Sequence, residues 1–150
     1  MARVKLQLPD AFKFHLDLRV RISDINRGNH VGNDTFLQFF NEARKRFFDQ
    51  LGYDEMDIEG VGLVIADAVI MYRSQAYYAD LLTVAVTVDD FNRNGCDLYY
   101  QITNRATGRE VVRAKTGIVF FDYDRNKIAG VPEEFRRKVE GFNQKLTGSE

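Results

Sequence analysis

A long apolar helix in the first half of the chain constrains the fold more than any other feature of this sequence. Between residues 34 and 51, apolar side chains recur at steps of four and three residues, which is the spacing of one helix face. They are Phe36, Phe40, Ala43 and Phe47, and the band is widened by Leu37, Phe39, Phe48 and Leu51. Asn33 or Asp34 can cap the start of this helix, and Gly52 can end it. A helix with so broad an apolar band must be enclosed by other elements.

The segments on both sides of this helix have the pattern of β-strands. Residues 12–23 alternate strictly between apolar and polar side chains, as expected of a strand with one buried face. Four later segments are rich in Val, Ile, Thr, Tyr and Phe, which favour strands, namely 61–73, 81–91, 97–104 and 110–122. Asn94-Gly95 and Ala106-Thr107-Gly108 suit tight hairpins. The sequence therefore predicts an α+β fold in which an antiparallel five-stranded sheet wraps around the long helix.

The rest of the chain adds one short element and no second domain. Pro132 begins an amphipathic segment with Phe135, Val139 and Phe142 at helical spacing, which predicts a short terminal helix. A chain of 150 residues, 45% of them hydrophobic, fits one compact domain, since domains commonly have ~100–150 residues. We expect a single domain over residues 1–146 and a loose tail over 147–150.

The charge balance and the cysteine count exclude several classes of function. Lys and Arg number 21 against 22 Asp and Glu, so the surface offers no field that would attract nucleic acid or an anionic membrane. No apolar stretch approaches the ~20 residues of a membrane span, and the first ten residues lack the apolar run of a signal peptide, so we expect a cytoplasmic protein. Cys96 is the single cysteine and allows neither an intrachain disulfide nor a multi-cysteine zinc site; we expect no metal.

Polar side chains gather in the loop between the first strand and the helix, over residues 23–35. The loop leads into the N-terminus of an apolar helix, where free backbone N–H groups can polarise a carbonyl or hold an anion. Gly28 and Gly32 would allow the backbone to approach a ligand closely. The loop could also be polar for solubility alone, but its position makes it the candidate functional site.

Three runs in this region carry a resemblance to a known family. Asp24-Ile25-Asn26 follows the first strand, Asn29-His30-Val31-Gly32-Asn33 precedes the helix, and Glu42-Ala43-Arg44 lies on it. In spacing and residue type these runs resemble the 4-hydroxybenzoyl-CoA thioesterase family of hotdog proteins, which has an Asp-x-Asp pair, a Gly-His-Val-Asn-Asn-like run and Glu-Ala-Arg at these places. The segment 72–81 and Val131-Pro132 are similar to later parts of the family. The resemblance therefore covers nearly the whole chain.

The resemblance implies a fold, an assembly and a reaction. The expected fold is the hotdog, whose sheets join in a homodimer that often pairs again into a homotetramer. The expected reaction is hydrolysis of an acyl-CoA thioester at a site shared between subunits, with CoA as part of the substrate and no further cofactor. By matching positions, backbone donors at Asn33, Asp34 and Thr35 would bind the thioester oxygen, and His30 matches a histidine at or beside the site.

One position departs from the family pattern. The second acidic residue of the pair, the family's usual nucleophile or general base, is Asn26 in this chain. A carboxamide can only orient water by hydrogen bonds, whereas a positioned base is worth ~10²–10⁴ in rate. Asp24 and His30 are the candidates to replace the base, with Asn26 as a hydrogen-bonding partner, although Asp24 could equally serve the turn by accepting backbone N–H groups. The candidate catalytic residues are therefore Asn26, His30 and Asp24.

Two other functions fit the same residues. Asp24-Ile25-Asn26 followed by His30 resembles the Asp-x-Asn-Pro-x-His motif of enoyl-CoA hydratases on the same fold. That motif places its Asp and His five positions apart, whereas the gap here is six and Arg27 stands at the proline position. The third hypothesis is a non-catalytic protein that binds acyl thioesters, because Asn26 would leave the pocket without its base.

Overall fold

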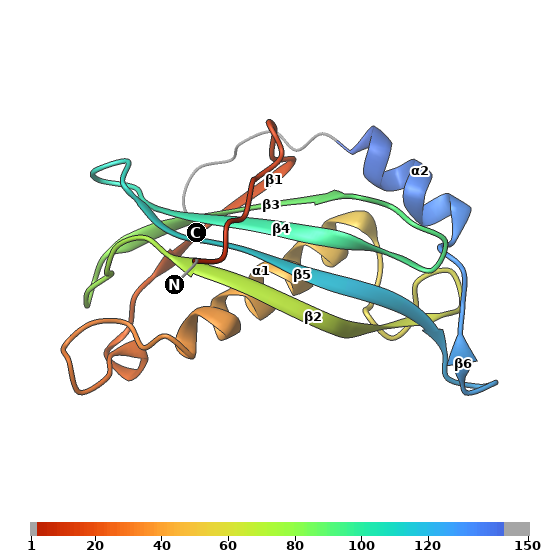
Figure 1. Ribbon diagram of the computed structural model, residues 1–150, viewed down its shortest axis with the longest axis horizontal. Coiled ribbons are helices and arrows are strands. Elements are labelled where there is room, and N and C mark those ends of the chain that lie inside the picture. Colours follow the sequence, from red (N-terminus) through yellow and green to blue (C-terminus); the bar gives the residue numbers. More distant parts are fainter. Residues whose placement is uncertain (1–2, 143–150) are drawn as a thin grey trace.

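The computed structural model describes residues 3–142 and is built from one antiparallel sheet and two α-helices (Figure 1). The strands are β1 Phe14–Arg19, β2 Gly62–Tyr72, β3 Leu81–Asp89, β4 Gly95–Asn104, β5 Glu110–Asp122 and β6 Lys127–Ile128. The helices are α1, Thr35–Leu51, and α2, Glu133–Gly141, and a short 3-10 turn, η1, covers Ile22–Asp24. The predicted order of a strand, a helix, a series of strands and a terminal helix is thus confirmed.

All strand pairs are antiparallel, in the order β1-β3-β4-β5-β2, with β6 beside β5. The α+β class is confirmed, but the sheet has six strands where five were predicted. The additional strand, β6, pairs two residues with the end of β5, and so short a strand has no period that the sequence could display. Because β1 and β2 lie at opposite edges, α1 carries the chain from one edge of the sheet to the other.

The helix α1 packs its apolar band against one face of the sheet (Figure 1). Its side chains with at most 3% of their surface exposed are Phe36, Phe40, Ala43, Phe47 and Phe48. Phe40 lies against Tyr100 of β4, with ring centroids 4.7 Å apart. Burial of each large apolar side chain contributes about 1.5–3 kcal/mol. These contacts therefore fix α1 on the sheet and with it the position of the helix N-terminus.

Both ends of α1 lie at the predicted residues. Gly52 follows the last turn with a φ of 84°, a left-handed conformation that glycine adopts without steric cost. Asp34 occupies the N-cap position, but its side chain makes no capping hydrogen bond. The first N–H groups of an α-helix have no partner within the helix, and this side chain does not satisfy them.

The first strand is shorter than the alternating pattern predicted. The pattern extends to residue 23, whereas β1 ends at Arg19 and Ile22 lies in η1 with 72% of its surface exposed. The Asp24 carboxylate accepts the Arg21 N–H at 2.8 Å. This local hydrogen bond turns the chain out of the strand, so Ile22 does not face the core as its place in the pattern predicted.

The predicted hairpin joins β3 and β4, but its turn does not lie at Asn94-Gly95. Gly95 is already part of β4, and the Oδ1 atom of Asn92 accepts the N–H groups of both Asn94 and Gly95, each at 3.0 Å. A Cβ at Gly95 would lie 1.9 Å from the Ile118 carbonyl oxygen of β5. Glycine is therefore required here by the close approach of two strands and not by the turn.

The terminal helix α2 forms as predicted, with Pro132 at its N-cap and Phe135 and Val139 buried. The expected tail over residues 147–150 lies outside the described residues. Within residues 3–142, no helix combines the length and the apolar character that crossing a membrane requires.

The strand β2 forms one edge of the sheet and exposes part of its length. No described strand pairs with its outer side. Ile65 has 42% of its surface exposed, and Ala66, Asp67 and Ala68 are exposed as well. An open edge presents unpaired N–H and C=O groups to which another strand can bind. The strand ends at Tyr72, beside the start of α1.

Candidate active site

The loop between β1 and α1 forms a small hairpin held by its own backbone. Ile25 and Val31 pair as an isolated antiparallel bridge. The Asn26 N–H donates to the His30 carbonyl oxygen at 3.0 Å, and the Asn29 N–H donates to the Asn26 carbonyl oxygen at 3.1 Å. Asn29 has a φ of 65°, which asparagine tolerates better than most residues. Asn26 and His30 therefore face each other across the base of this hairpin.

Two hydrogen bonds tie the hairpin and the residues that lead into α1 to β2 and to the connection that follows it. The Val31 N–H donates to the Ala76 carbonyl oxygen at 2.8 Å. Tyr72 donates its hydroxyl hydrogen to the Asn33 carbonyl oxygen at 2.9 Å, and its ring contacts Phe36 with centroids 5.9 Å apart. No role for Tyr72 could be predicted from the sequence, because 39 positions separate it from Asn33 and no local pattern relates the two.

The His30 ring lies over Gly28. A Cβ at Gly28 would be 2.8 Å from His30 Nε2 and 3.4 Å from Asn26 Oδ1, so the glycine leaves room for the imidazole. The other ring nitrogen, Nδ1, is 3.2 Å from the Val31 carbonyl oxygen. In the tautomer with its proton on Nδ1, the ring donates to Val31 and keeps Nε2 as a free acceptor. Asn26 Oδ1 accepts the Gly28 N–H at 2.9 Å, which leaves the Asn26 NH₂ group as a donor.

Gly32 lies between Asn26 and the first turn of α1. A Cβ at Gly32 would be 3.6 Å from Asn26 Cβ and 2.8 Å from Asp34 Oδ1. Asn26 and Asp34 therefore border the same glycine. The hairpin thus brings two of the predicted catalytic residues, Asn26 and His30, to the start of the helix.

The N-terminus of α1 has free backbone donors. The Thr35 N–H donates to the Gly32 carbonyl oxygen at 3.0 Å, and the Leu37 N–H donates to the Asp34 carbonyl oxygen at 3.2 Å. Among the hydrogen bonds of residues 3–142, none has the Asn33 or Asp34 N–H as its donor. Three backbone N–H donors were expected from the sequence. The Thr35 N–H is already hydrogen-bonded, whereas the Asn33 and Asp34 N–H groups are available to a ligand. Free N–H groups at this end of a helix carry partial positive charge.

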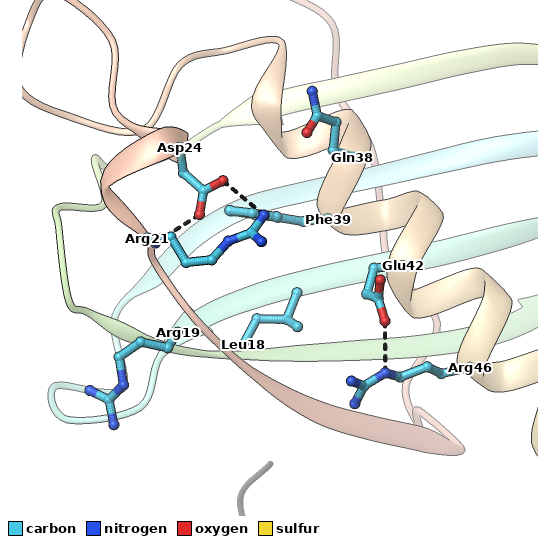
Figure 2. Close-up of a pocket in the computed structure, with 8 residues that line it drawn as sticks. All are labelled: Leu18, Arg19, Arg21, Asp24, Gln38, Phe39, Glu42 and Arg46. Atoms are coloured by element: carbon cyan, nitrogen blue, oxygen red, sulfur yellow. Dashed lines mark hydrogen bonds and ion pairs between the residues drawn. The ribbon is translucent and has the colours of Figure 1, made fainter.

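The third predicted catalytic residue, Asp24, lies beside Gly32, whose N–H donates to the Asp24 carbonyl oxygen at 3.3 Å, but the Asp24 carboxylate is engaged by Arg21. It is 4% exposed, and its two carboxylate oxygens face the Arg21 N–H at 2.8 Å and the Arg21 guanidinium at 3.5 Å. Figure 2 shows this pair in a groove between β1 and α1, where Glu42 accepts a hydrogen bond from Arg46 at 2.8 Å. The other residues that line the groove are Leu18, Arg19, Gln38 and Phe39. This geometry matches the turn-forming role considered for Asp24.

A buried polar network lies further along α1. Arg44 is 8% exposed and donates to Glu55 at 2.7 Å and to Asn41 at 3.1 Å. Its neighbour Tyr100 shares a hydrogen bond of 2.9 Å with Thr116, and burial raises the pKa of the Tyr100 hydroxyl. Buried polar groups cost stability unless they are paired. Arg44, the last residue of the Glu-Ala-Arg run, therefore serves the core of the fold.

Neither a metal centre nor a cysteine nucleophile emerges from the described part of the chain. Residues 3–142 contain no group of three or more His, Cys, Asp or Glu side chains that could hold a metal ion. Cys96 is 1% exposed on the inner face of β4, and burial raises the pKa of its thiol. A thiol that keeps its proton is a poor nucleophile. The start of α1 is thus the candidate active site.

Comparison with solved structures gives the same fold in known and probable thioesterases. The 1,4-dihydroxy-2-naphthoyl-CoA thioesterase from Synechocystis is 20% identical with a TM-score of 0.80, over 89% of this chain and 99% of that one. The probable thioesterase YbaW from Escherichia coli is 26% identical with a TM-score of 0.76, over 87% and 98%. A mutant of 4-hydroxybenzoyl-CoA thioesterase, complexed with 4-hydroxybenzoyl-CoA, is 19% identical with a TM-score of 0.76, over 86% and 99%.

Comparison of the sequence with protein families agrees with the likeness in fold. No curated protein matches this sequence. A sequence model of the thioesterase-like superfamily matches residues 20–139, which include the hairpin, α1 and all strands after β1. The resemblance to hotdog thioesterases found in the sequence is confirmed, and the chain belongs to the thioesterase-like superfamily.

Proposed function

We propose that this protein hydrolyses an acyl-CoA thioester at the N-terminus of α1. The observation that carries the proposal is a hairpin that brings Asn26 and His30 to the start of α1, where the Asn33 and Asp34 N–H groups have no hydrogen-bond partner within residues 3–142. A thioester carbonyl develops negative charge on its oxygen during hydrolysis, and preorganised N–H groups at a helix N-terminus stabilise that charge. Membership of the thioesterase-like superfamily supports the choice of substrate class.

In the proposed mechanism, the substrate carbonyl oxygen accepts hydrogen bonds from the Asn33 and Asp34 N–H groups. The Asn26 NH₂ group orients a water molecule, and His30 Nε2 takes a proton from it as the water oxygen bonds to the carbonyl carbon. The tetrahedral intermediate then breaks its C–S bond, and the CoA sulfur receives the proton from His30. The products are the free acid and CoA, and the enzyme returns to its starting protonation state.

His30 fits the role of base better than the other two candidates. Asn26 cannot accept a proton under these conditions, and both oxygens of Asp24 are already bonded to Arg21. The Nδ1 atom of His30 faces the Val31 carbonyl oxygen, which favours the tautomer with a free Nε2.

We further propose that the site is shared between two subunits, as in related hotdog proteins. Pairing of the open β2 edge with the β2 edge of a second copy would bury Ile65 and continue the sheet across the dimer. Because β2 ends at Tyr72 beside the start of α1, the partner would lie close to the candidate active site. A cytoplasmic location fits both an acyl-CoA substrate and the unpaired thiol of Cys96.

The proposal is tested by measuring CoA thiol release from a panel of acyl-CoAs. The wild type should turn over at least one of them, and His30→Ala should lower kcat by ~10²–10⁴ with little change in melting temperature. His15→Ala is the matched control, since His15 is the only other histidine and lies on β1. Asp34→Asn tests the remaining carboxylate at the site. A His30→Ala protein as fast as the control would remove His30 from the mechanism.

A second candidate function is binding of acyl-CoA without hydrolysis, and Asn26 is the observation that favours it. One of the similar structures is an aspartate-to-asparagine mutant of 4-hydroxybenzoyl-CoA thioesterase that holds 4-hydroxybenzoyl-CoA. Thermal stabilisation by acyl-CoAs without any thiol release would support this function. Hydration of an enoyl-CoA without thiol release would instead support the hydratase hypothesis.

A further inference from the structure

Tyr72 makes a contact at the start of α1 that has no part in the proposed chemical steps. Its hydroxyl donates to the Asn33 carbonyl oxygen at 2.9 Å, from the end of β2 to the residue that precedes the N-cap of α1. Among the hydrogen bonds of residues 3–142, no other donor reaches this carbonyl oxygen. The tyrosine ring packs against Phe36, which holds the hydroxyl in place.

The Asn33 carbonyl and the Asp34 N–H belong to the same peptide group. A peptide group is planar and trans, so its C=O and N–H point in opposite directions. A hydrogen bond that fixes the Asn33 carbonyl oxygen on one side therefore fixes the direction of the Asp34 N–H on the other. Donation to the carbonyl oxygen also polarises the peptide group and strengthens its N–H as a donor.

We propose that Tyr72 is a positioning residue for catalysis, which aims and polarises the Asp34 N–H at the thioester oxygen. This inference rests on the proposed function. Tyr72 does not touch the substrate in this arrangement; it acts through the peptide group between Asn33 and Asp34. The edge strand β2 thereby takes part in stabilising the charge that develops at the start of α1.

Two further observations fit this role and not one in packing alone. Tyr72 has 50% of its surface exposed, so its hydroxyl is not a buried polar group that requires a partner within the protein. Desolvation, and secondarily the negative charge of Asp34, raise the pKa of Tyr72 above its usual value. The hydroxyl consequently stays protonated and able to donate throughout the pH range in which the thioester is stable enough to assay.

The test is Tyr72→Phe, which removes the hydroxyl and keeps the ring against Phe36. Tyr77→Phe is the matched control: Tyr77 has 51% of its surface exposed, lies in the connection between β2 and β3, and donates to Gln75 at 2.9 Å. Loss of a complete oxyanion donor costs ~10²–10³ in kcat. Because Tyr72→Phe only loosens one donor, we expect kcat to fall about tenfold, with KM within about twofold and an unchanged pH profile.

A second readout follows the peptide group directly. The Asp34 amide proton resonance should move upfield in Tyr72→Phe and stay in place in Tyr77→Phe, because hydrogen bonding to the preceding carbonyl is lost only in the first variant. A wild type that hydrolyses acyl-CoAs together with a Tyr72→Phe variant of equal kcat would overturn this inference and leave the proposed function intact. A fall in KM or melting temperature without a fall in kcat would overturn it as well. A wild type with no hydrolysis would instead overturn the proposed function, and this inference with it.

Discussion

Adding one methyl group at Gly28 should disable His30 without removing it. The Cβ of an alanine at this position would lie 2.8 Å from His30 Nε2 and 3.3 Å from Cδ2. Both distances are shorter than the ~3.5–4.0 Å at which non-bonded carbon atoms pack. The imidazole must therefore turn away from the hairpin, and the contact of its Nδ1 with the Val31 carbonyl oxygen at 3.2 Å would be lost.

The expected loss in rate is that of a general base. A positioned base contributes ~10²–10⁴, which corresponds to about 3–5 kcal/mol of transition-state stabilisation, so kcat of Gly28→Ala should fall by that factor. Stability should change by less than ~1 kcal/mol, because Gly28 is exposed and one weak hydrogen bond is lost. Gly141→Ala at the end of α2 is the matched control, since a Cβ there meets no atom within 4 Å.

The assay is thiol release from the best acyl-CoA substrate, measured for Gly28→Ala, His30→Ala and the double variant. If the two changes disable the same group, the double variant should be no slower than His30→Ala. Melting temperatures of Gly28→Ala and Gly141→Ala separate a catalytic defect from unfolding. A well-folded Gly28→Ala protein that works at the wild-type rate would refute the assignment of His30 as the base.

Three further predictions concern other parts of the molecule. Asn26→Asp should slow hydrolysis if the proposed mechanism holds, because a carboxylate would displace the water that the mechanism assigns to Asn26; an increase of a decade or more in kcat would instead indicate a binding protein that lost its base. Ile65→Lys puts a charge on the exposed edge of β2, so light scattering at micromolar concentration should shift from dimer toward monomer, and a monomeric wild type would contradict the shared site. Burial raises the pKa of the Cys96 thiol, so a thiol reagent at pH 8 should label the protein only after unfolding in denaturant; rapid labelling of the native protein would contradict the buried position.

The helix and the strands could be predicted because their signals are local. The period of the phenylalanines defines α1 from residue 35 to residue 51, and the predicted strand 110–122 coincides with β5. The prediction failed where a single hydrogen bond or a single close approach overrides the pattern. Ile22 continues the apolar alternation of the first strand, but the Asp24 carboxylate turns the chain before it.

The candidate site could be predicted only where its residues lie close together in the sequence. Asn26 and His30 belong to one hairpin, so their neighbourhood follows from a short stretch of sequence. Tyr72 reaches the start of α1 across the fold, from a strand that begins after the whole of that helix. The engagement of Asp24 by Arg21 depends on how the chain turns after β1, and the alternating pattern gave a strand there instead.

Gly95 restricts the register in which β4 can pair with β5. The crossing point beside the Ile118 carbonyl oxygen has no space for a side chain, because a Cβ there would be 1.9 Å from that oxygen. Sliding β4 by one residue along β5 would bring Asn94 or Cys96 to this point, and both carry a Cβ. Such a slip would also turn the buried side chains of β4, among them Tyr100, to the opposite face of the sheet. The glycine therefore favours the observed alignment of β4 with β5 over alignments that place a side chain at this point.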